Sequence, residues 1–98
     1  MTEENKNLVG LVCKNIEDGD LGKAMFLLEK DEAVNPETKM GLYFKIAEQA
    51  IEDMNEIMAK DNYDVNTFNL VNSYAERSFK NVNALERKQK YNRLAQMI

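Results

Sequence analysis

The sequence contains no histidine and no tryptophan, and its single cysteine is Cys13. Without histidine, the chain lacks the usual general base of enzymes and the commonest metal ligand. One cysteine closes no internal disulfide, builds no zinc site and has no histidine to activate it as a nucleophile. We therefore expect a non-enzymatic protein with no catalytic residue, no cofactor and no bound metal.

Glycine and proline are also scarce, with four Gly and one Pro among 98 residues. A sheet protein of this length needs several tight turns, and such turns draw on these two residue types. The glycines also lack the spacing of phosphate-binding loops. The sequence therefore predicts an all-α fold, a compact bundle of four to five helices arranged as helical hairpins around a long central helix. A chain of this length predicts a single helical domain over residues 1–98.

Long hydrophobic runs are missing as well. No apolar stretch approaches the roughly 18–20 residues that a membrane-spanning helix needs. The first residues, Met1 to Asn5, are acidic and unlike a secretion signal, and one cysteine suits a reducing compartment. We therefore expect a cytoplasmic protein with no membrane partner.

Residues that begin and end helices divide the chain. Gly19 suits the end of one helix and Asp20 the start of the next, while Asn35 and Pro36 suit a cap and a first helical position. The apolar spacing continues across Asn81–Asn83, which favours an unbroken helix, but two asparagines there favour a break. With that break, we expect helices at about residues 2–18, 21–30, 36–60, 65–80 and 84–98.

The predicted central helix, residues 36–60, carries two apolar seams. The first seam consists of Met40, Phe44, Ala47, Ile51, Met54 and Met58, and the second of Tyr43, Ile46, Ala50 and Ile57. Two seams require neighbours on two sides of the helix, and 98 residues are few to bury both within one chain. We therefore predict a homodimer with Tyr43, Ile46 and Ile57 at the contact.

Two acidic groups have the spacing of possible metal sites. Glu48, Glu52 and Glu56 follow one another at intervals of four residues, but helical di-iron sites pair such carboxylates with histidine. Residues 18–29 resemble the spacing of a calcium loop, yet Lys23 stands where that loop requires glycine. We interpret the first group as a solvated helix face and the second as a turn followed by a helix. An enzyme that uses carboxylates and a divalent metal stays a minor alternative.

Charge is distributed unevenly along the chain. Residues 1–75 hold 15 acidic and 7 basic side chains, whereas residues 76–98 hold 2 acidic and 6 basic ones. The body is therefore acidic, at −8, and the C-terminal part is basic, at +4. Residues 84–98 are interpreted as a basic C-terminal helix, an appended arm. Glu76 with Lys80 and Glu86 with Lys90 are spaced for pairing along a helix. The candidate partner-binding residues are the remaining cations, Arg77, Arg87, Lys88 and Arg93.

The pattern as a whole favours an interaction protein. We predict a non-catalytic protein–protein interaction module, a small adaptor or regulator that binds another protein and associates with itself. The alternative is a nucleic-acid-binding regulator that uses the basic C-terminal helix. Four cations support only weak, salt-sensitive phosphate binding, and the acidic body opposes it, so nucleic acid is the less favoured partner.

Overall fold

Four α-helices and no strand make up residues 3–97, the part of the chain that this computed structural model describes, with side chains described for residues 6–97. The prediction of an all-α fold is therefore confirmed. Thr2 and Ile98, which the expected helices included, lie outside the described residues. The four helices are α1 (Glu3–Glu17), α2 (Leu21–Lys30), α3 (Pro36–Met58) and α4 (Val65–Met97).

The turn between α1 and α2 follows the prediction from Gly19 and Asp20. Gly19 has a φ of 83°, a left-handed conformation that glycine adopts without a steric penalty. The Gly19 N–H donates to the Ile16 carbonyl at 3.1 Å, and the Asp20 N–H donates to the Asn15 carbonyl at 2.8 Å. This pair of bonds satisfies the last carbonyls of α1. The Asp20 carboxylate then accepts from the Lys23 N–H and caps α2.

Side chains also cap the starts of the two long helices, and Asn35 is the cap that the sequence predicts for the first of them. The Asn35 side chain accepts a hydrogen bond from the Thr38 N–H at 2.8 Å at the start of α3. At the start of α4, the Asp64 carboxylate accepts from the Thr67 hydroxyl and from the Asn66 N–H, each at 2.9 Å. These bonds, first that of Thr67, lower the pKa of the Asp64 carboxyl below its usual value.

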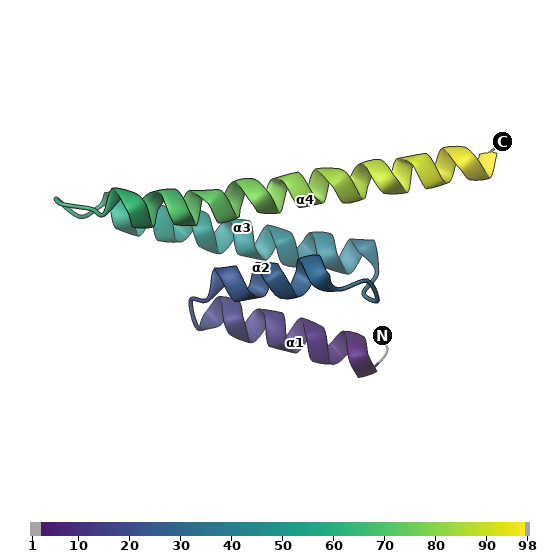
Figure 1. Cartoon of the computed structure of the whole chain (residues 1–98), viewed down its shortest axis with the longest axis horizontal. Helices are drawn as coiled ribbons and strands as arrows, with labels where there is room; N and C mark the ends of the chain where they lie inside the picture. The colour runs from purple at the N-terminus through teal and green to yellow at the C-terminus, as the bar shows by residue number, and fades with distance from the viewer. Residues whose placement is uncertain (1–2, 98) are drawn as a thin grey trace.

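The helices form two hairpins, α1–α2 and α3–α4, which lie side by side (Figure 1). Helix α3 contacts all three other helices, and α2 also contacts α4. The described chain is long and flat, about 57 × 30 × 16 Å, because both ends of the α3–α4 hairpin reach beyond the shorter α1–α2 hairpin (Figure 1). The core lies where the hairpins meet and consists of Val12, Leu21, Ala24, Met25, Leu28, Leu42, Tyr43, Ile46, Ala50, Ala75 and Val82.

Helix α4 runs unbroken from residue 65 to residue 97, so the expected break near Asn81–Asn83 and the separate helix at 84–98 are absent. The Asn81 side chain donates to a Glu29 carboxylate oxygen at 2.8 Å and lies 3.7 Å from the Met25 sulfur. Its amide is therefore engaged with α2 and does not compete for the helix backbone. Val82, only 3% exposed, packs into the core beside it and holds this turn in the helix.

The side chains of the two seams of α3 differ in how much of their surface is exposed. Tyr43 and Ile46 from one seam are 2% and 0% exposed, and they pack inside the chain itself. Phe44, Ile51 and Met58 from the other seam keep 48%, 43% and 50% of their surface exposed. Ala47 of that same seam is only 2% exposed, and Met40 and Met54 are half-buried against the core, so the seam is divided. The exposed apolar side of α3 therefore carries Phe44, Ile51 and Met58, and not Tyr43 and Ile46 as expected.

Candidate functional site

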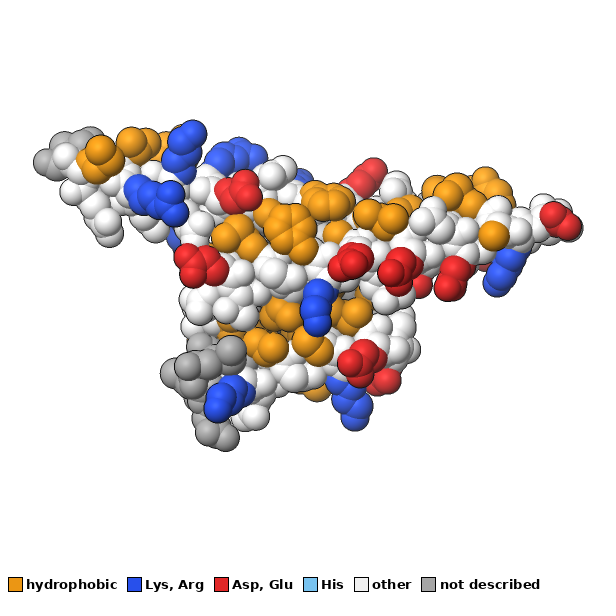
Figure 2. Space-filling model, turned by 180° about the vertical axis from the view of Figure 1, so that it is seen from behind, with side chains coloured by type: hydrophobic (Ala, Val, Ile, Leu, Met, Phe, Trp, Pro, Cys, Tyr) orange, Lys and Arg blue, Asp and Glu red, His pale blue; other side chains and the backbone are white. Residues whose placement is uncertain are grey.

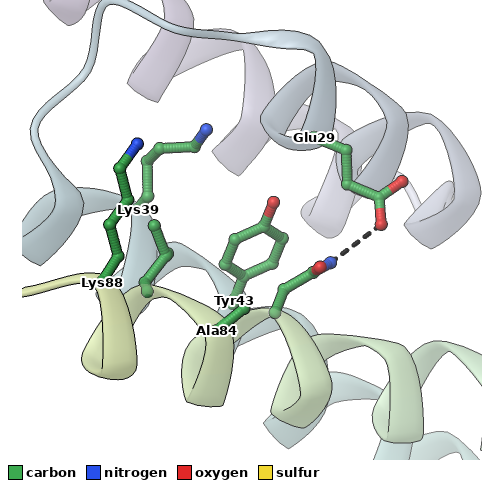
Figure 3. A pocket seen from close by; sticks show the side chains of 7 residues that line it. Glu29, Lys39, Tyr43, Ala84 and Lys88 are labelled. Atoms are coloured by element: carbon green, nitrogen blue, oxygen red, sulfur yellow. Dashed lines mark hydrogen bonds between the residues drawn. The ribbon is translucent and has the colours of Figure 1, made fainter. Parts of the chain in front are cut away.

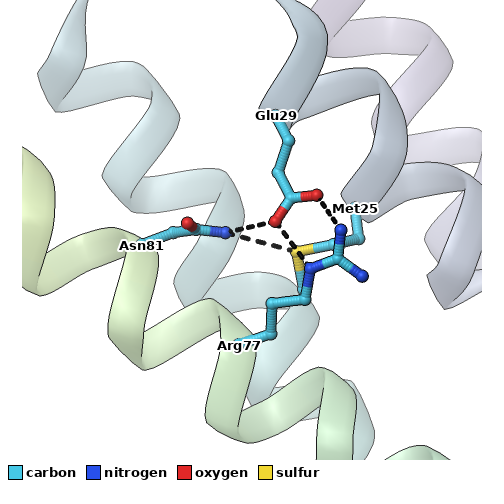
Figure 4. Close-up of polar contacts among 4 residues, drawn as sticks. All are labelled: Met25, Glu29, Arg77 and Asn81. Atoms are coloured by element: carbon cyan, nitrogen blue, oxygen red, sulfur yellow. Dashed lines mark hydrogen bonds and ion pairs between the residues drawn. The ribbon is translucent and has the colours of Figure 1, made fainter.

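Glu29 on α2 and Arg77 on α4 form an ion pair that joins the two hairpins (Figure 4). The Arg77 Nε donates to one Glu29 oxygen at 2.7 Å, a second guanidinium nitrogen donates to the other oxygen, and Asn81 adds a bond to the first. Burial alone raises the pKa of Glu29, but the bonds from Arg77 and Asn81 and the nearby positive charges lower it below its usual value. Glu29 is therefore ionised and paired at neutral pH, and Arg77 is committed within the chain.

A cavity of about 340 Å³ opens beside this ion pair, between α2, α3 and α4 (Figure 3). The ammonium groups of Lys39 and Lys88 reach toward the same space, and the Tyr43 hydroxyl points into it (Figure 3). Lys39 also donates to the Asp31 backbone carbonyl at 2.6 Å. The positive side of the cavity suits an anionic group. The residues that line it are Glu29, Lys39, Tyr43, Asn81, Ala84, Leu85 and Lys88.

Two groups on the cavity wall, Glu29 and Tyr43, have pKa values displaced away from neutral pH. Burial, together with the negative charge of Glu29, raises the pKa of Tyr43 to about 12. The pKa of Glu29 is displaced in the other direction, below its usual value. A general acid or base works best with a pKa near the operating pH, so neither group is suited to proton transfer at neutral pH.

A row of exposed hydrophobic side chains runs along one side of the α3–α4 hairpin. Phe44, Ile51 and Met58 follow one another at seven-residue intervals, which places them along one side of α3. The Phe79 ring of α4 meets the Phe44 ring, with 6.3 Å between centroids. Figure 2 shows hydrophobic side chains along both long helices on one side of the molecule. We call this row the hairpin face, and it consists of Phe44, Ile51, Met58, Val65 and Phe79.

The two ends of the hairpin carry opposite charge. The end where α3 passes into α4, residues 48–64, holds six acidic side chains and one basic one, Lys60. The other end is the last part of α4, residues 86–97, with four basic side chains and one acidic one. Figure 2 shows basic groups gathered at that end and acidic groups along the rest of the row. We call residues 48–64 the acidic end and residues 86–97 the C-terminal overhang.

The C-terminal overhang is almost wholly exposed. Every side chain from Glu86 to Met97 is exposed, apart from Gln89, which is half-buried. Tyr91, an aromatic residue, is 71% exposed. Among the described side chains, the expected ion pairs Glu76–Lys80 and Glu86–Lys90 are not formed. Glu76 instead accepts a hydrogen bond from Asn72 at 3.2 Å.

The candidate residues predicted from the sequence lie in different parts of the structure. Arg87, Lys88 and Arg93 lie together on the overhang, whereas Arg77 lies on the body and is paired with Glu29. Of the three expected dimer-contact residues, Tyr43 and Ile46 are in the core, and Ile57 is half-buried. Sequence reasoning missed the hairpin face as a surface. The signal for it was the seven-residue spacing of Phe44, Ile51 and Met58, which was interpreted as a packed seam.

Other candidate sites have little support. Glu48, Glu52 and Glu56 are exposed, as expected of a solvated helix face. Within residues 6–97, no three Cys, Asp or Glu side chains gather closely enough to hold a metal ion. Over the described residues, no helix has the length and apolarity needed to cross a membrane. Cys13 is half-buried against the core and makes no disulfide.

A comparison of the chain with protein families, with curated proteins and with solved structures finds no match.

Proposed function

We propose that this chain is a non-catalytic module, an adaptor or small regulator, that binds another protein through the hairpin face. The observation that carries the proposal is the exposure of Phe44, Ile51 and Met58 in one row, each at 43–50%. Single exposed apolar residues are ordinary on protein surfaces. A contiguous row flanked by charged side chains is typical of a protein interface.

The chemistry of the cavity also supports a binding role. Its carboxylate, Glu29, is held by Arg77 and Asn81, and the pKa of its phenol, Tyr43, is raised to about 12. The groups closest to the cavity are therefore used in packing α2 against α4. Their arrangement stabilises the scaffold that presents the hairpin face.

The test is capture of a partner from a native lysate with the immobilised protein. The variant Ile51→Glu places a charge in the middle of the hairpin face, where burial of an unpaired charge is unfavourable. The matched control is Phe26→Asp, because Phe26 on α2 is 56% exposed but lies outside the face. We expect the captured protein to be lost with Ile51→Glu and kept with Phe26→Asp. Equal capture by both variants contradicts the proposal.

One observation favours a second candidate, a nucleic-acid-binding regulator. The overhang gathers Arg87, Lys88, Lys90 and Arg93 on one exposed stretch of α4. A phosphate-binding arm predicts binding to a labelled duplex or single strand that weakens steeply with salt and is lost when Arg87, Lys88 and Arg93 become Glu. The absence of binding at low salt eliminates this candidate.

A further inference from the structure

We infer that the partner of the hairpin face is a second copy of this chain, packed antiparallel, with the C-terminal overhang of each copy against the acidic end of the other. This inference rests on the proposed function, because it names the occupant of the same face. It differs from the homodimer expected from the sequence, which used Tyr43 and Ile46. Those side chains are buried within the chain and are not available to a partner.

The opposite charges of the acidic end and the overhang favour a second copy of the chain as the partner that covers the hairpin face. The acidic end carries a net charge of −5, from six acidic and one basic side chain over residues 48–64. The overhang carries +3, from four basic and one acidic side chain over residues 86–97. Among the described side chains, the cations of the overhang make no ion pair within their own chain. A second copy supplies a surface of matching sign, and the hairpin face overlaps the acidic end, because Ile51 and Met58 lie within residues 48–64.

The orientation follows from the same charges. Two copies that meet through one face are related by a two-fold axis lying in the interface. If that axis runs along the helices, overhang meets overhang and acidic end meets acidic end, which places like charges together. If the axis runs across the helices, each overhang meets an acidic end. The antiparallel arrangement is therefore the electrostatically complementary one.

The size of the face suits a stable dimer. The row from Phe44 to Met58 spans roughly 21 Å at about 1.5 Å per residue, and two packed helices are roughly 20 Å wide. The face alone therefore covers an area on the order of 400 Å², and the contacts of each overhang with an acidic end add to it, toward the roughly 800 Å² per partner that a standard interface buries. The axis then passes close to the Phe44–Phe79 ring pair, so the aromatic pairs of the two copies face each other.

Sedimentation equilibrium of the full chain tests the dimer. We expect a mass twice the 11.3 kDa of one chain at high micromolar concentration, falling toward the monomer on dilution. Phe44→Glu should weaken the dimer by roughly 30-fold or more, because the axis passes beside Phe44 and the new charges of the two copies then lie close together. Phe26→Asp should leave it unchanged, and circular dichroism confirms that both variants fold.

A charge exchange tests the orientation. One variant carries Lys88→Glu, Lys90→Glu and Arg93→Glu, which changes the net charge of the overhang to −3, and the other carries Glu52→Lys, Glu56→Lys and Asp61→Lys, which changes that of the acidic end to +1. In the antiparallel dimer, each variant alone faces like charges and should dimerise at least about tenfold more weakly than the wild type. An equimolar mixture restores attraction at both contacts, so it should dimerise about as well as the wild type at low salt. In a parallel dimer, where each end meets its own kind, each variant alone dimerises at least as well as the wild type, and that result overturns the orientation.

The failure of this inference is distinguishable from the failure of the proposed function. A wild-type chain that stays monomeric up to high micromolar concentration overturns the second copy as occupant. The capture experiment with Ile51→Glu and Phe26→Asp then decides the proposed function by itself. The assignment to the hairpin face is overturned if Phe26→Asp weakens the dimer as much as Phe44→Glu does.

Discussion

Phe44 of α3 and Phe79 of α4 meet edge to face, with 6.3 Å between ring centroids and 63° between ring planes. Such aromatic pairs contribute about 0.5–1.5 kcal/mol beyond the area they bury. Both rings nevertheless keep much of their surface exposed, at 48% and 42%. The pair therefore holds the α3–α4 hairpin together and presents an aromatic surface to solvent at the same time.

One side of α3 is exposed and the other is buried, so substitutions close together on α3 should reduce the free energy of unfolding by different amounts. Ile51 is 43% exposed, so Ile51→Glu should reduce the free energy of unfolding by no more than about 1–2 kcal/mol. Ile46 is 0% exposed, so Ile46→Asp buries an unpaired charge and should unfold the chain. Urea denaturation followed by circular dichroism measures both. A folded Ile46→Asp variant, or an unfolded Ile51→Glu variant, contradicts the assignment of the two sides of α3.

The Glu29–Arg77 pair predicts a dependence of stability on acid. The pKa of Glu29 in the folded protein lies below its ordinary value of 4.5, so its contribution is present above that value and is lost as pH falls through the folded pKa. Glu29→Gln removes this contribution. Because the Arg77 side chain is 53% exposed, we expect the wild type to exceed the variant by only about 1 kcal/mol or less at neutral pH.

Denaturation of both proteins over a range of pH measures this difference. The gap between the wild type and Glu29→Gln should close as pH falls below 4.5. A gap that widens with acid contradicts the ion pair. Arg77→Met, with the carboxylate kept, should lose stability at neutral pH.

The raised pKa of Tyr43 predicts that the folded protein loses stability at high pH, whereas the lowered pKa of Glu29 predicts a loss at low pH. The ordinary tyrosine value is 10.0 and that of folded Tyr43 is about 12, so its contribution is present below pH 10 and is lost as pH rises toward 12. Tyrosinate absorbance measures it directly, since the chain has four tyrosines and no tryptophan. We expect a late phase near pH 12 that Tyr43→Phe lacks. Identical late phases in the two proteins contradict the burial of this hydroxyl.

Ser78 on α4 is 0% exposed, and among the described side chains its hydroxyl is the buried polar group without a hydrogen-bond partner. Desolvation of an unpaired hydroxyl costs about 1–3 kcal/mol. Ser78→Ala removes that group without changing the helix, so we expect a gain in the free energy of unfolding of about 1 kcal/mol. A loss of stability in urea denaturation of this variant means that the hydroxyl has a partner.

Much of the fold was predictable from local chemistry. Asn35 with Pro36, and Gly19 with Asp20, mark helix boundaries because their preferences act over only a few residues. The unbroken α4 was not predictable in this way. The amide of Asn81 bonds to Glu29, a residue 52 positions earlier, so a contact distant in the sequence outweighs a local tendency to break the helix.

The candidate site was less predictable, for a related reason. Tyr43 and Phe44 are adjacent in the sequence and both are apolar, yet one is 2% and the other 48% exposed. Helical periodicity shows that both seams are apolar, but only the packing of the other helices against α3 decides which side chains of each seam are covered. The overhang cations Arg87, Lys88 and Arg93 were found from composition, because a local excess of positive charge is visible in any sequence.

The central claim is that a protein partner, a second copy or another chain, covers the hairpin face. Hydroxyl-radical footprinting tests it most directly, because oxidation reports the solvent exposure of individual side chains. The comparison is between the dilute protein and the protein in its captured complex or at high concentration. We expect oxidation of Phe44, Met58 and Phe79 to fall several-fold while that of Phe26, an equally exposed ring on α2, stays constant. Protection of Phe26 with unchanged oxidation of Phe44 and Met58 contradicts the claim.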